Sequence, residues 1–249
     1  MNPNVAHEPM IKIENLYKKY GDNVVLDGFN LNLYQGENLV IMGKSGSGKS
    51  VMIKCLIGLE IPDSGTIEIM SQKLEHLSLK ALDEIRADIG FLFQGSALYD
   101  SMTVRENLEF PLRRHISKFG NVKDTLPLVE EALQNVGLKN VIDLMPNELS
   151  GGMKRRVALA RTLILKPKII IYDEPTTGLD PITSKEIILL MKSVQEKYKT
   201  SSIIITHDVD CARVIANRMI LLIDGKNYAE GTFAELSTSQ DPKVKAFFK

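Results

Sequence analysis

Apolar and polar residues alternate in the first part of the chain, as they do in strands that expose one face to solvent. The alternation is clear at residues 11–13 and 31–33, and turn-forming residues lie at positions 21–23 and 35–36. Alternation with a period of two between turn signals is typical of antiparallel strands with one buried face. The pattern therefore predicts an antiparallel β portion near the start of the chain.

The later apolar segments are short and uninterrupted, and they lie at residues 39–42, 169–172, 203–205 and 219–223. Strands that are buried on both faces have this pattern, which is common in parallel sheets covered by helices. Helical segments separate these blocks at residues 50–58, 153–165 and 183–197. The alternation predicts an α/β core with helices on both faces of a parallel sheet.

Residues 95–161 contain no strand pattern. Thr103 and Glu106 form a capping box before apolar residues at helical spacing, and residues 128–136 form a second amphipathic segment. The polar residues 113–125, which include Gly120 and Asn121, are typical of a surface loop. We therefore predict a helical insertion in the α/β fold.

Composition and charge narrow the possible partners. The 249 residues contain 31 Lys and Arg and 31 Asp and Glu, so the formal net charge is zero. Because no overall basic field exists, nucleic acid is not predicted as a partner. The two cysteines, Cys55 and Cys211, lie far apart and fit a reducing compartment. The apolar runs are too short to span a bilayer, and we expect neither secretion nor a membrane-spanning segment.

Residues 43–50 match the P-loop pattern G-x-x-x-x-G-K-[ST] between a predicted strand and a predicted helix. Its glycines let successive N–H groups converge on phosphate oxygens at a helix N-terminus, where the helix dipole favours negative charge. Lys49 can reach the β- and γ-phosphates, and the Ser50 hydroxyl can bind Mg²⁺. The motif predicts a nucleoside triphosphate as ligand.

Two adjacent carboxylates, Asp173 and Glu174, follow the apolar residues 169–172. Neighbouring carboxylates at a strand end repel each other unless a cation is present. Asp173 is therefore predicted to hold Mg²⁺, and Glu174 to act as the general base or to position the attacking water.

The sequence Leu149-Ser150-Gly151-Gly152-Met153, here called the signature motif, begins a helical segment and offers a second anion-binding helix N-terminus. With the P-loop, Gln94, the paired carboxylates, residues 178–180 and His207 in this order, the chain resembles an ATP-binding-cassette (ABC) ATPase over essentially its whole length. A signature motif that lies between the P-loop and the paired carboxylates separates this family from P-loop kinases, GTPases and helicases.

This resemblance implies a fold and a domain organisation. The fold is an α/β P-loop NTPase of the RecA-like type, with a parallel-sheet core, an antiparallel β subdomain and an inserted α-helical subdomain. Residues 1–249 form a single ABC ATPase domain, with a nucleotide-binding core at about 1–94 and 162–249 and a helical subdomain at about 95–161.

The resemblance also implies roles for individual residues, with ATP and Mg²⁺ as cofactors. Tyr20 matches the aromatic residue that stacks on adenine, Gln94 the glutamine that contacts Mg²⁺ and water, and His207 the histidine that contacts the γ-phosphate. Members work as head-to-tail pairs, in which the signature motif of one copy completes the P-loop site of the other and Asp180 lines the interface. The implied catalytic residues are Glu174, His207 and Gln94, and the implied metal ligands are Ser50, Gln94 and Asp173. The implied nucleotide-binding residues are Tyr20, Gly43, Lys44, Ser45, Gly46, Ser47, Gly48, Lys49, Ser50, Val51, Ser150, Gly151, Gly152 and Asp180.

A finer resemblance rests on residues 93–104, on Met153 with residues 154–161, and on residues 180–184, which together look like the Mla-type ATPases. Those ATPases serve bacterial MCE-protein phospholipid transporters that maintain outer-membrane lipid asymmetry. The implied partners are a transmembrane permease, a second copy of the chain and an MCE-domain protein, with the chain at the cytoplasmic face of the inner membrane. The segment after Gln94, with Leu98, Tyr99, Met102 and Phe110, is then expected to receive a helix of the permease.

Three alternatives stay open at this point. A cassette ATPase for amino acids or lipoproteins would share most of these motifs. A soluble cassette ATPase acting on ribosomes or DNA typically has tandem cassettes or long coiled-coil insertions, which do not fit in 249 residues. A P-loop small-molecule kinase would need an acceptor-binding lid and would have no use for the signature motif.

Overall fold

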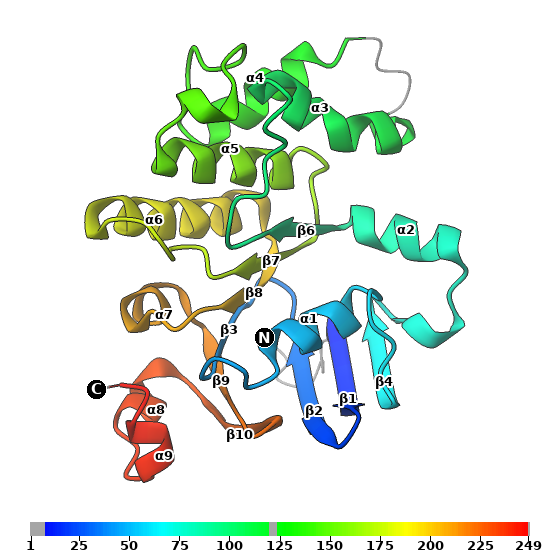
Figure 1. Ribbon diagram of the computed structural model, residues 1–249, viewed down its shortest axis with the longest axis vertical. Helices are drawn as coiled ribbons and strands as arrows, with labels where there is room; N and C mark the ends of the chain where they lie inside the picture. The colour runs from blue at the N-terminus through cyan, green and yellow to red at the C-terminus, as the bar shows by residue number, and fades with distance from the viewer. Residues whose placement is uncertain (1–7, 120–123, 249) are drawn as a thin grey trace, which may run out of the picture. The chain divides into compact units, whose positions relative to one another are not determined.

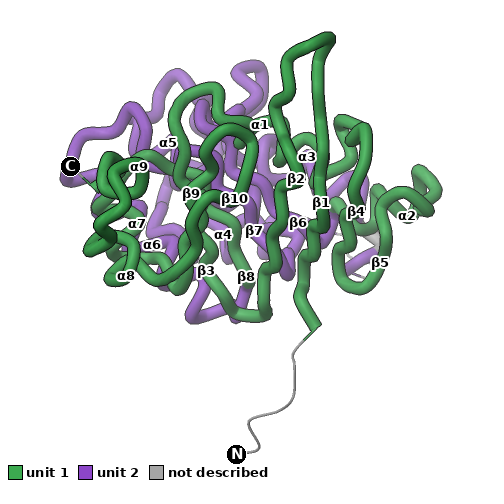
Figure 2. The backbone as a smooth tube through the Cα atoms, turned by 90° about the horizontal axis from the view of Figure 1, so that it is seen from below, with its two compact units in different colours: residues 1–86, 201–249 green, residues 87–200 purple. Residues whose placement is uncertain are grey.

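The computed structural model describes residues 8–119 and 124–248, and the chain divides into two compact units (Figure 2). Unit 1 consists of Met1–Arg86 and Ser201–Lys249, and unit 2 of Ala87–Thr200. The predicted helical subdomain at residues 95–161 lies within unit 2. The boundaries predicted for this subdomain, near residues 95 and 161, are not tested by the division into two units.

Unit 1 contains an antiparallel sheet with the strand order β2-β1-β4-β5 (Figure 2). Its buried positions alternate with exposed ones over much of β1 and β2, which confirms the predicted antiparallel portion. Gly65 has a positive φ, and a Cβ there would lie 2.5 Å from the carbonyl oxygen of Asn15, so only glycine fits this crossing. The strands are β1 (Ile11–Tyr20), β2 (Asn23–Leu33), β4 (Ser64–Ile69) and β5 (Gln72–Lys73).

Unit 1 also contains parallel strands that are almost wholly buried. β3 (Asn38–Met42) lies between β8 (Ser201–Ile205) and β9 (Arg218–Ile223), and it is parallel to both. β10 (Lys226–Gly231) is antiparallel to β9 at the edge. Every residue of β3 and β8 is buried, which confirms the parallel core predicted from their uninterrupted apolar sequences. Because these strands are parallel, the loops that follow β3, β8 and β9 begin at the same edge.

Helices connect and flank these strands in unit 1 (Figure 1). α1 directly follows the P-loop, and α7 follows β8 after a short loop that contains His207. Helices α2, α8 and α9 were not among the predicted elements. The bounds are α1 (Lys49–Leu56), η1 (Leu74–His76), α2 (Leu79–Ala87), α7 (Val209–Ile215), α8 (Phe233–Ser237) and α9 (Pro242–Lys245).

Unit 2 combines a parallel strand pair with a set of helices. β6 (Ile89–Leu92) pairs with β7 (Ile169–Asp173), and the intervening described residues contain helices but no strand, as predicted. Helix α5 contacts α3, α4, α6 and β6, so it lies at the centre of this unit. The helices are α3 (Val104–His115), η2 (Ile116–Phe119), α4 (Leu126–Asn135), η3 (Pro146–Glu148), α5 (Gly151–Leu163) and α6 (Pro181–Tyr198).

The loop predicted at residues 113–125 is wrong at its start, because α3 continues to His115 and η2 follows it. Glu109 forms i,i+4 ion pairs with Arg105 at 2.8 Å and with Arg113 at 3.6 Å, and the second of these favours continuation of the helix to Arg113. Desolvation by burial acts to raise the pKa of Glu109, but hydrogen bonds from Arg105 and Thr125 outweigh this effect. The pKa of Glu109 therefore lies below its ordinary value. A charged pair that apolar periodicity does not report thus supports the helix beyond the predicted end. Gly120 and Asn121 lie outside the described residues.

None of the helices formed by residues 8–119 and 124–248 combines the length and the apolar character needed to cross a lipid bilayer.

Candidate nucleotide site

The P-loop follows β3 directly and leads into α1, as the sequence predicts. A Cβ on Gly43 would lie 2.4 Å from Ser47 Oγ and 2.8 Å from the carbonyl oxygen of Leu222. Gly48 has a φ of +104°, and a Cβ there would lie 2.7 Å from the carbonyl oxygen of Val25. Glycine is therefore required at both positions, because any side chain would push the loop out of its curve.

Two side chains of the P-loop bear directly on an anionic ligand. The Lys49 ammonium donates hydrogen bonds to the carbonyl oxygens of Gly43 at 2.6 Å and Lys44 at 3.0 Å. The Ser47 hydroxyl is buried and has no hydrogen-bond partner among the described protein atoms. Buried polar groups are normally paired, so a hydroxyl of this kind suits a bound ligand oxygen. The loop thus has a cation and a donor in place for phosphate.

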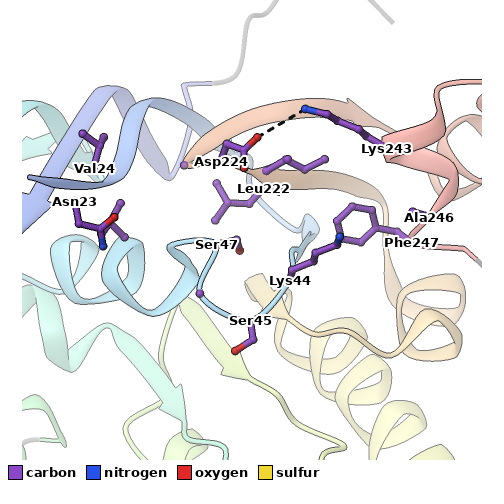
Figure 3. A pocket seen from close by; sticks show the side chains of 14 residues that line it. Asn23, Val24, Lys44, Ser45, Ser47, Leu222, Asp224, Lys243, Ala246 and Phe247 are labelled. Atoms are coloured by element: carbon purple, nitrogen blue, oxygen red, sulfur yellow. Dashed lines mark ion pairs between the residues drawn. The ribbon is translucent and has the colours of Figure 1, made fainter.

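A cavity of about 570 Å³ opens beside the P-loop within unit 1 (Figure 3). Its volume lies within the range of small-molecule sites, which is roughly 300–1,000 Å³. Lys44 and Lys243 supply cationic groups, and Lys243 forms a 3.7 Å ion pair with Asp224. The lining residues are Asn23, Val24, Val25, Lys44, Ser45, Gly46, Ser47, Leu222, Ile223, Asp224, Gly225, Lys243, Ala246 and Phe247.

Tyr20 lies at the end of β1 and is 45% exposed. The Lys18 ammonium is 5.3 Å from the centre of its ring, and desolvation together with the nearby Glu60 raises the pKa of its phenol. Tyr20 does not line the cavity, whose wall begins instead at Asn23 on the next strand. Its role in stacking on adenine stays a prediction.

His207 is exposed and lies in the loop between β8 and α7. Ile41 of β3 pairs with Ile205 of β8 in parallel, so His207 emerges at the same edge of the sheet as the P-loop. Asp208, the next residue, caps α7 by accepting hydrogen bonds from two backbone N–H groups. The topology of unit 1 therefore brings two of the predicted site elements to one edge.

A second group of predicted site residues lies in unit 2. Leu92 of β6 pairs with Tyr172 of β7, so Gln94 and the carboxylates of Asp173 and Glu174 follow the same ends of two parallel strands. Glu174 has a φ of 49°, an uncommon conformation for a residue with a side chain. Its carboxylate accepts a hydrogen bond from the Thr177 hydroxyl at 3.1 Å.

The signature motif begins α5, and Ser150 is the N-cap, with its hydroxyl accepting from the Met153 N–H at 3.2 Å. A Cβ on Gly152 would lie 2.8 Å from the Thr183 methyl group in the first turn of α6. Asp180 caps α6, and hydrogen bonds from the Thr183 hydroxyl and backbone lower the pKa of its carboxyl. The motif and Asp180 are thus joined within unit 2 through Thr183.

The predicted site residues form two sets, one in each unit. Part of the cavity wall was not among the predicted site residues, namely Asn23, Asp224, Lys243 and Phe247. The dipeptide Asp224-Gly225 is a recognisable turn signal and marks the loop after β9. Nothing in the sequence near Lys243 and Phe247 indicates a ligand.

Comparison with known proteins identifies the family. Residues 26–177 match the family described as ABC transporter. The intermembrane phospholipid transport system ATP-binding protein MlaF of Haemophilus influenzae is 40% identical over 243 residues, which cover 98% of this chain and 91% of that protein. The methionine import ATP-binding protein MetN of Campylobacter jejuni is 36% identical over 252 residues, covering 96% of this chain and 75% of that protein.

A solved structure supports the same assignment. The dimeric structure of a post-hydrolysis state of the ATP-binding cassette MJ0796, bound to ADP and Pi, matches with a TM-score of 0.79 and 37% identity. The match covers 90% of this chain and 99% of that chain. The motifs, the fold and these similarities agree, and the chain belongs to the ABC transporter family as an ATP-hydrolysing cassette.

Proposed function

We propose that this ATPase subunit powers phospholipid transport across a bacterial cell envelope. The observation that carries the proposal is the 40% identity with the phospholipid transport protein MlaF over 98% of the chain. The signature motif has methionine at position 153 and is followed by arginines at 155 and 156. These residues are part of the resemblance to the Mla-type ATPases of phospholipid transporters.

For ATP hydrolysis, we assign the phosphates to the P-loop. Lys49 and the N–H groups at the start of α1 hold the β- and γ-phosphates, and Ser47 donates its unpaired hydroxyl to a phosphate oxygen. Glu174 accepts a proton from the water that attacks the γ-phosphorus, the bond to the β–γ bridging oxygen breaks, and ADP and phosphate form. Gln94 orients this water, and His207 contacts the γ-phosphate.

The residues present also fit Mg²⁺, which prefers oxygen ligands and phosphate. The exposed Ser50 hydroxyl in the first turn of α1 and the Asp173 carboxylate at the end of β7 would hold it, together with the Gln94 amide oxygen. When bound, the ion would neutralise part of the charge on the phosphates.

The site is proposed to work between two copies of the chain. Ser150, Gly151 and Gly152 of one copy would complete the P-loop site of the other, with Asp180 at the interface. Gly151 is exposed and the N-terminal end of α5 carries no acidic residue in its first turn, so this helix start is suited to an anion. The dimeric state of the related cassette bound to ADP and Pi supports the arrangement.

The proposed partners are a transmembrane permease and an MCE-domain protein, with the chain on the cytoplasmic face of the inner membrane. The segment after Gln94 has a fixed backbone, because the buried Asn107 side chain bonds both the N–H and the carbonyl group of Tyr99. On this support the Tyr99 and Phe110 rings lie 4.7 Å apart, and both are over 40% exposed. Aromatic residues held in this way are typical of protein interfaces.

Tyr99→Glu should disrupt assembly with the permease and leave ATP binding by the isolated subunit intact. A carboxylate buried at the interface loses its hydration, and the Arg161 guanidinium, which lies 5.7 Å from the centre of the Tyr99 ring, offsets only part of that cost. We therefore expect affinity for the permease to fall by at least about tenfold. Leu98→Glu should act in the same direction, although Leu98 is half-buried and its substitution also affects folding. The measurements are pull-down with the native membrane partner and calorimetric titration with ATP.

Leu189→Glu is the matched control for these variants, since Leu189 is 51% exposed on α6 in the same unit. It should retain both assembly and ATP binding. Full assembly and lipid transport by both the Tyr99 and Leu98 variants would place the docking surface elsewhere, and loss of ATP binding would assign these residues to the fold.

The proposed function is tested by purifying the tagged full-length chain from its native membranes and analysing the associated proteins and lipids. We expect a membrane-spanning partner, an MCE-domain protein and bound phospholipid, and ATP-dependent phospholipid transfer after reconstitution. Co-purification with an amino-acid permease would contradict the proposal in favour of the kind of import named for MetN. Co-purification with a lipoprotein permease would contradict it in favour of lipoprotein transport. Association with ribosomes or DNA in the absence of a membrane protein would contradict the transport role altogether.

A further inference from the structure

Arg155 is a charged side chain enclosed within unit 2. It lies in α5, close to the signature motif, and is only 4% exposed. Within the described residues, its hydrogen-bond acceptors are three backbone carbonyl oxygens, and burial lowers the pKa of its guanidinium. Burying a cation against neutral acceptors is unfavourable compared with an apolar residue of similar size. Stability of the core therefore does not explain an arginine at this position.

The three carbonyl groups belong to the two loops that carry the proposed catalytic residues. The Arg155 guanidinium donates to the carbonyl oxygens of Phe93 at 2.8 Å and Gln94 at 2.5 Å in the loop after β6. It also donates to the carbonyl oxygen of Thr177 at 3.3 Å, in the loop after β7 that begins with Glu174. One side chain thus joins the loop of Gln94, the loop of Glu174 and the helix of the signature motif.

Both loops contain residues in a backbone conformation that they do not adopt freely. Ser96 and Ala97 have φ values of 63° and 47°, and Glu174 has a φ of 49°. Such conformations persist only where surrounding contacts impose them. Arg161, on the same helix, adds hydrogen bonds to the carbonyl oxygens of Ser96 at 3.0 Å and Ala97 at 2.8 Å. Helix α5 therefore supplies the contacts that hold these loops.

We propose that Arg155 is a positioning residue for ATP hydrolysis, whose guanidinium fixes the Gln94 and Glu174 loops relative to the signature motif. The inference rests on the roles proposed above for Gln94 and Glu174. Arg155 acts through the backbone of these loops, so its loss misplaces the Gln94 side chain and the general base. The P-loop belongs to unit 1 and does not depend on these hydrogen bonds.

Arg155→Met tests the inference, because methionine fills similar space but donates no hydrogen bond. In the full-length protein, kcat for ATP should fall at least about tenfold, while KM should change by less than about twofold, the pattern of a loss confined to the chemical step. Arg155→Lys should have an intermediate kcat, since one ammonium reaches fewer of the three carbonyl groups than a planar guanidinium. Rates are compared after thermal unfolding has established that each variant is folded.

Arg156→Met is the matched control, because this neighbouring guanidinium bonds the Val136 carbonyl oxygen at 2.8 Å and Glu186 at 2.9 Å, away from both loops. It should lower the melting temperature and leave kcat unchanged. An equal fall in kcat for Arg155→Met and Arg156→Met would overturn the inference, because the effect would then follow stability alone. If Arg155→Met does not fold, a wild-type kcat for Arg155→Lys overturns it equally.

Gln94→Ala and the double variant with Arg155→Met separate this inference from the proposed site. We expect Gln94→Ala to be slow and the double variant to be slower by less than the product of the two single effects, as for residues that act as a unit. If the kcat for ATP falls in Gln94→Ala but stays at the wild-type value in Arg155→Met, the proposed catalytic site is supported and the positioning role of Arg155 is rejected. Wild-type turnover of both Gln94→Ala and Glu174→Gln would reject the proposed site and the inference together.

Discussion

Replacement of Lys49 by alanine is expected to weaken ATP binding roughly ten- to hundredfold, the value of one charge-assisted hydrogen bond at about 1.5–3 kcal/mol. The Lys49 ammonium lies against the carbonyl oxygens of Gly43 and Lys44, at the centre of the P-loop curve where the phosphates are proposed to bind. Without it, the negative charge of the phosphates is balanced only by Mg²⁺, backbone N–H groups and the remaining cations. Isothermal titration calorimetry of the folded variant with ATP and Mg²⁺ measures the change.

Lys54→Ala provides the control for this prediction, because Lys54 is an exposed cation in the last turn of the same helix. This substitution removes the same charge from the chain, but Lys54 lies at the other end of α1 from the P-loop. The ATP affinity should therefore stay close to that of the wild type. Equal ATP affinity of the Lys49 variant and the wild type would remove the basis for assigning the phosphates to the P-loop.

Replacement of Glu174 by glutamine should leave ATP binding intact and reduce the hydrolysis rate by about 10²–10⁴-fold, the usual contribution of a positioned general base. Glutamine keeps the shape of the side chain and can still accept the hydrogen bond from the Thr177 hydroxyl. The ATP-bound pair should then persist, since hydrolysis is the step that ends it. ATPase rates and analytical ultracentrifugation with ATP and Mg²⁺ measure the two effects separately.

Glu196→Gln controls for the loss of one carboxylate, because Glu196 is exposed near the end of α6 in the same unit. Its turnover and its sedimentation should match those of the wild type. Near-normal turnover of the Glu174 variant would transfer the role of general base to another residue, with His207 the first to be examined.

The nucleotide-binding core was predictable because its strands and its P-loop are local patterns. Residues 39–42 and 203–205 are uninterrupted apolar blocks, and in the structure these positions are buried in parallel strands. The P-loop requires glycine for steric reasons at Gly43 and Gly48, so its sequence carries its conformation. In both cases, the property that determines the structure is visible within a few consecutive residues.

The contacts that the sequence did not predict depend on residues far apart in the chain. The guanidinium of Arg155 bonds carbonyl groups of residues 93, 94 and 177, and backbone carbonyl acceptors leave no trace in side-chain patterns. Lys243 and Phe247 join the cavity wall beside residues 44–47 only through the path of the C-terminal segment. The extension of α3 past Pro111 is supported by the ion pair of Glu109 with Arg113, which the apolar periodicity does not report.

The buried amide of Asn107 has a consequence for how this protein changes during evolution. It bonds the backbone of Tyr99, Met102 and Thr103 and is itself fully enclosed. The backbone path of residues 99–103 is therefore set by a buried side chain that a partner protein cannot reach. The exposed side chains of this segment do not set that path. Sequence drift at an exposed position such as 99 can then alter the proposed docking surface while the segment keeps its shape.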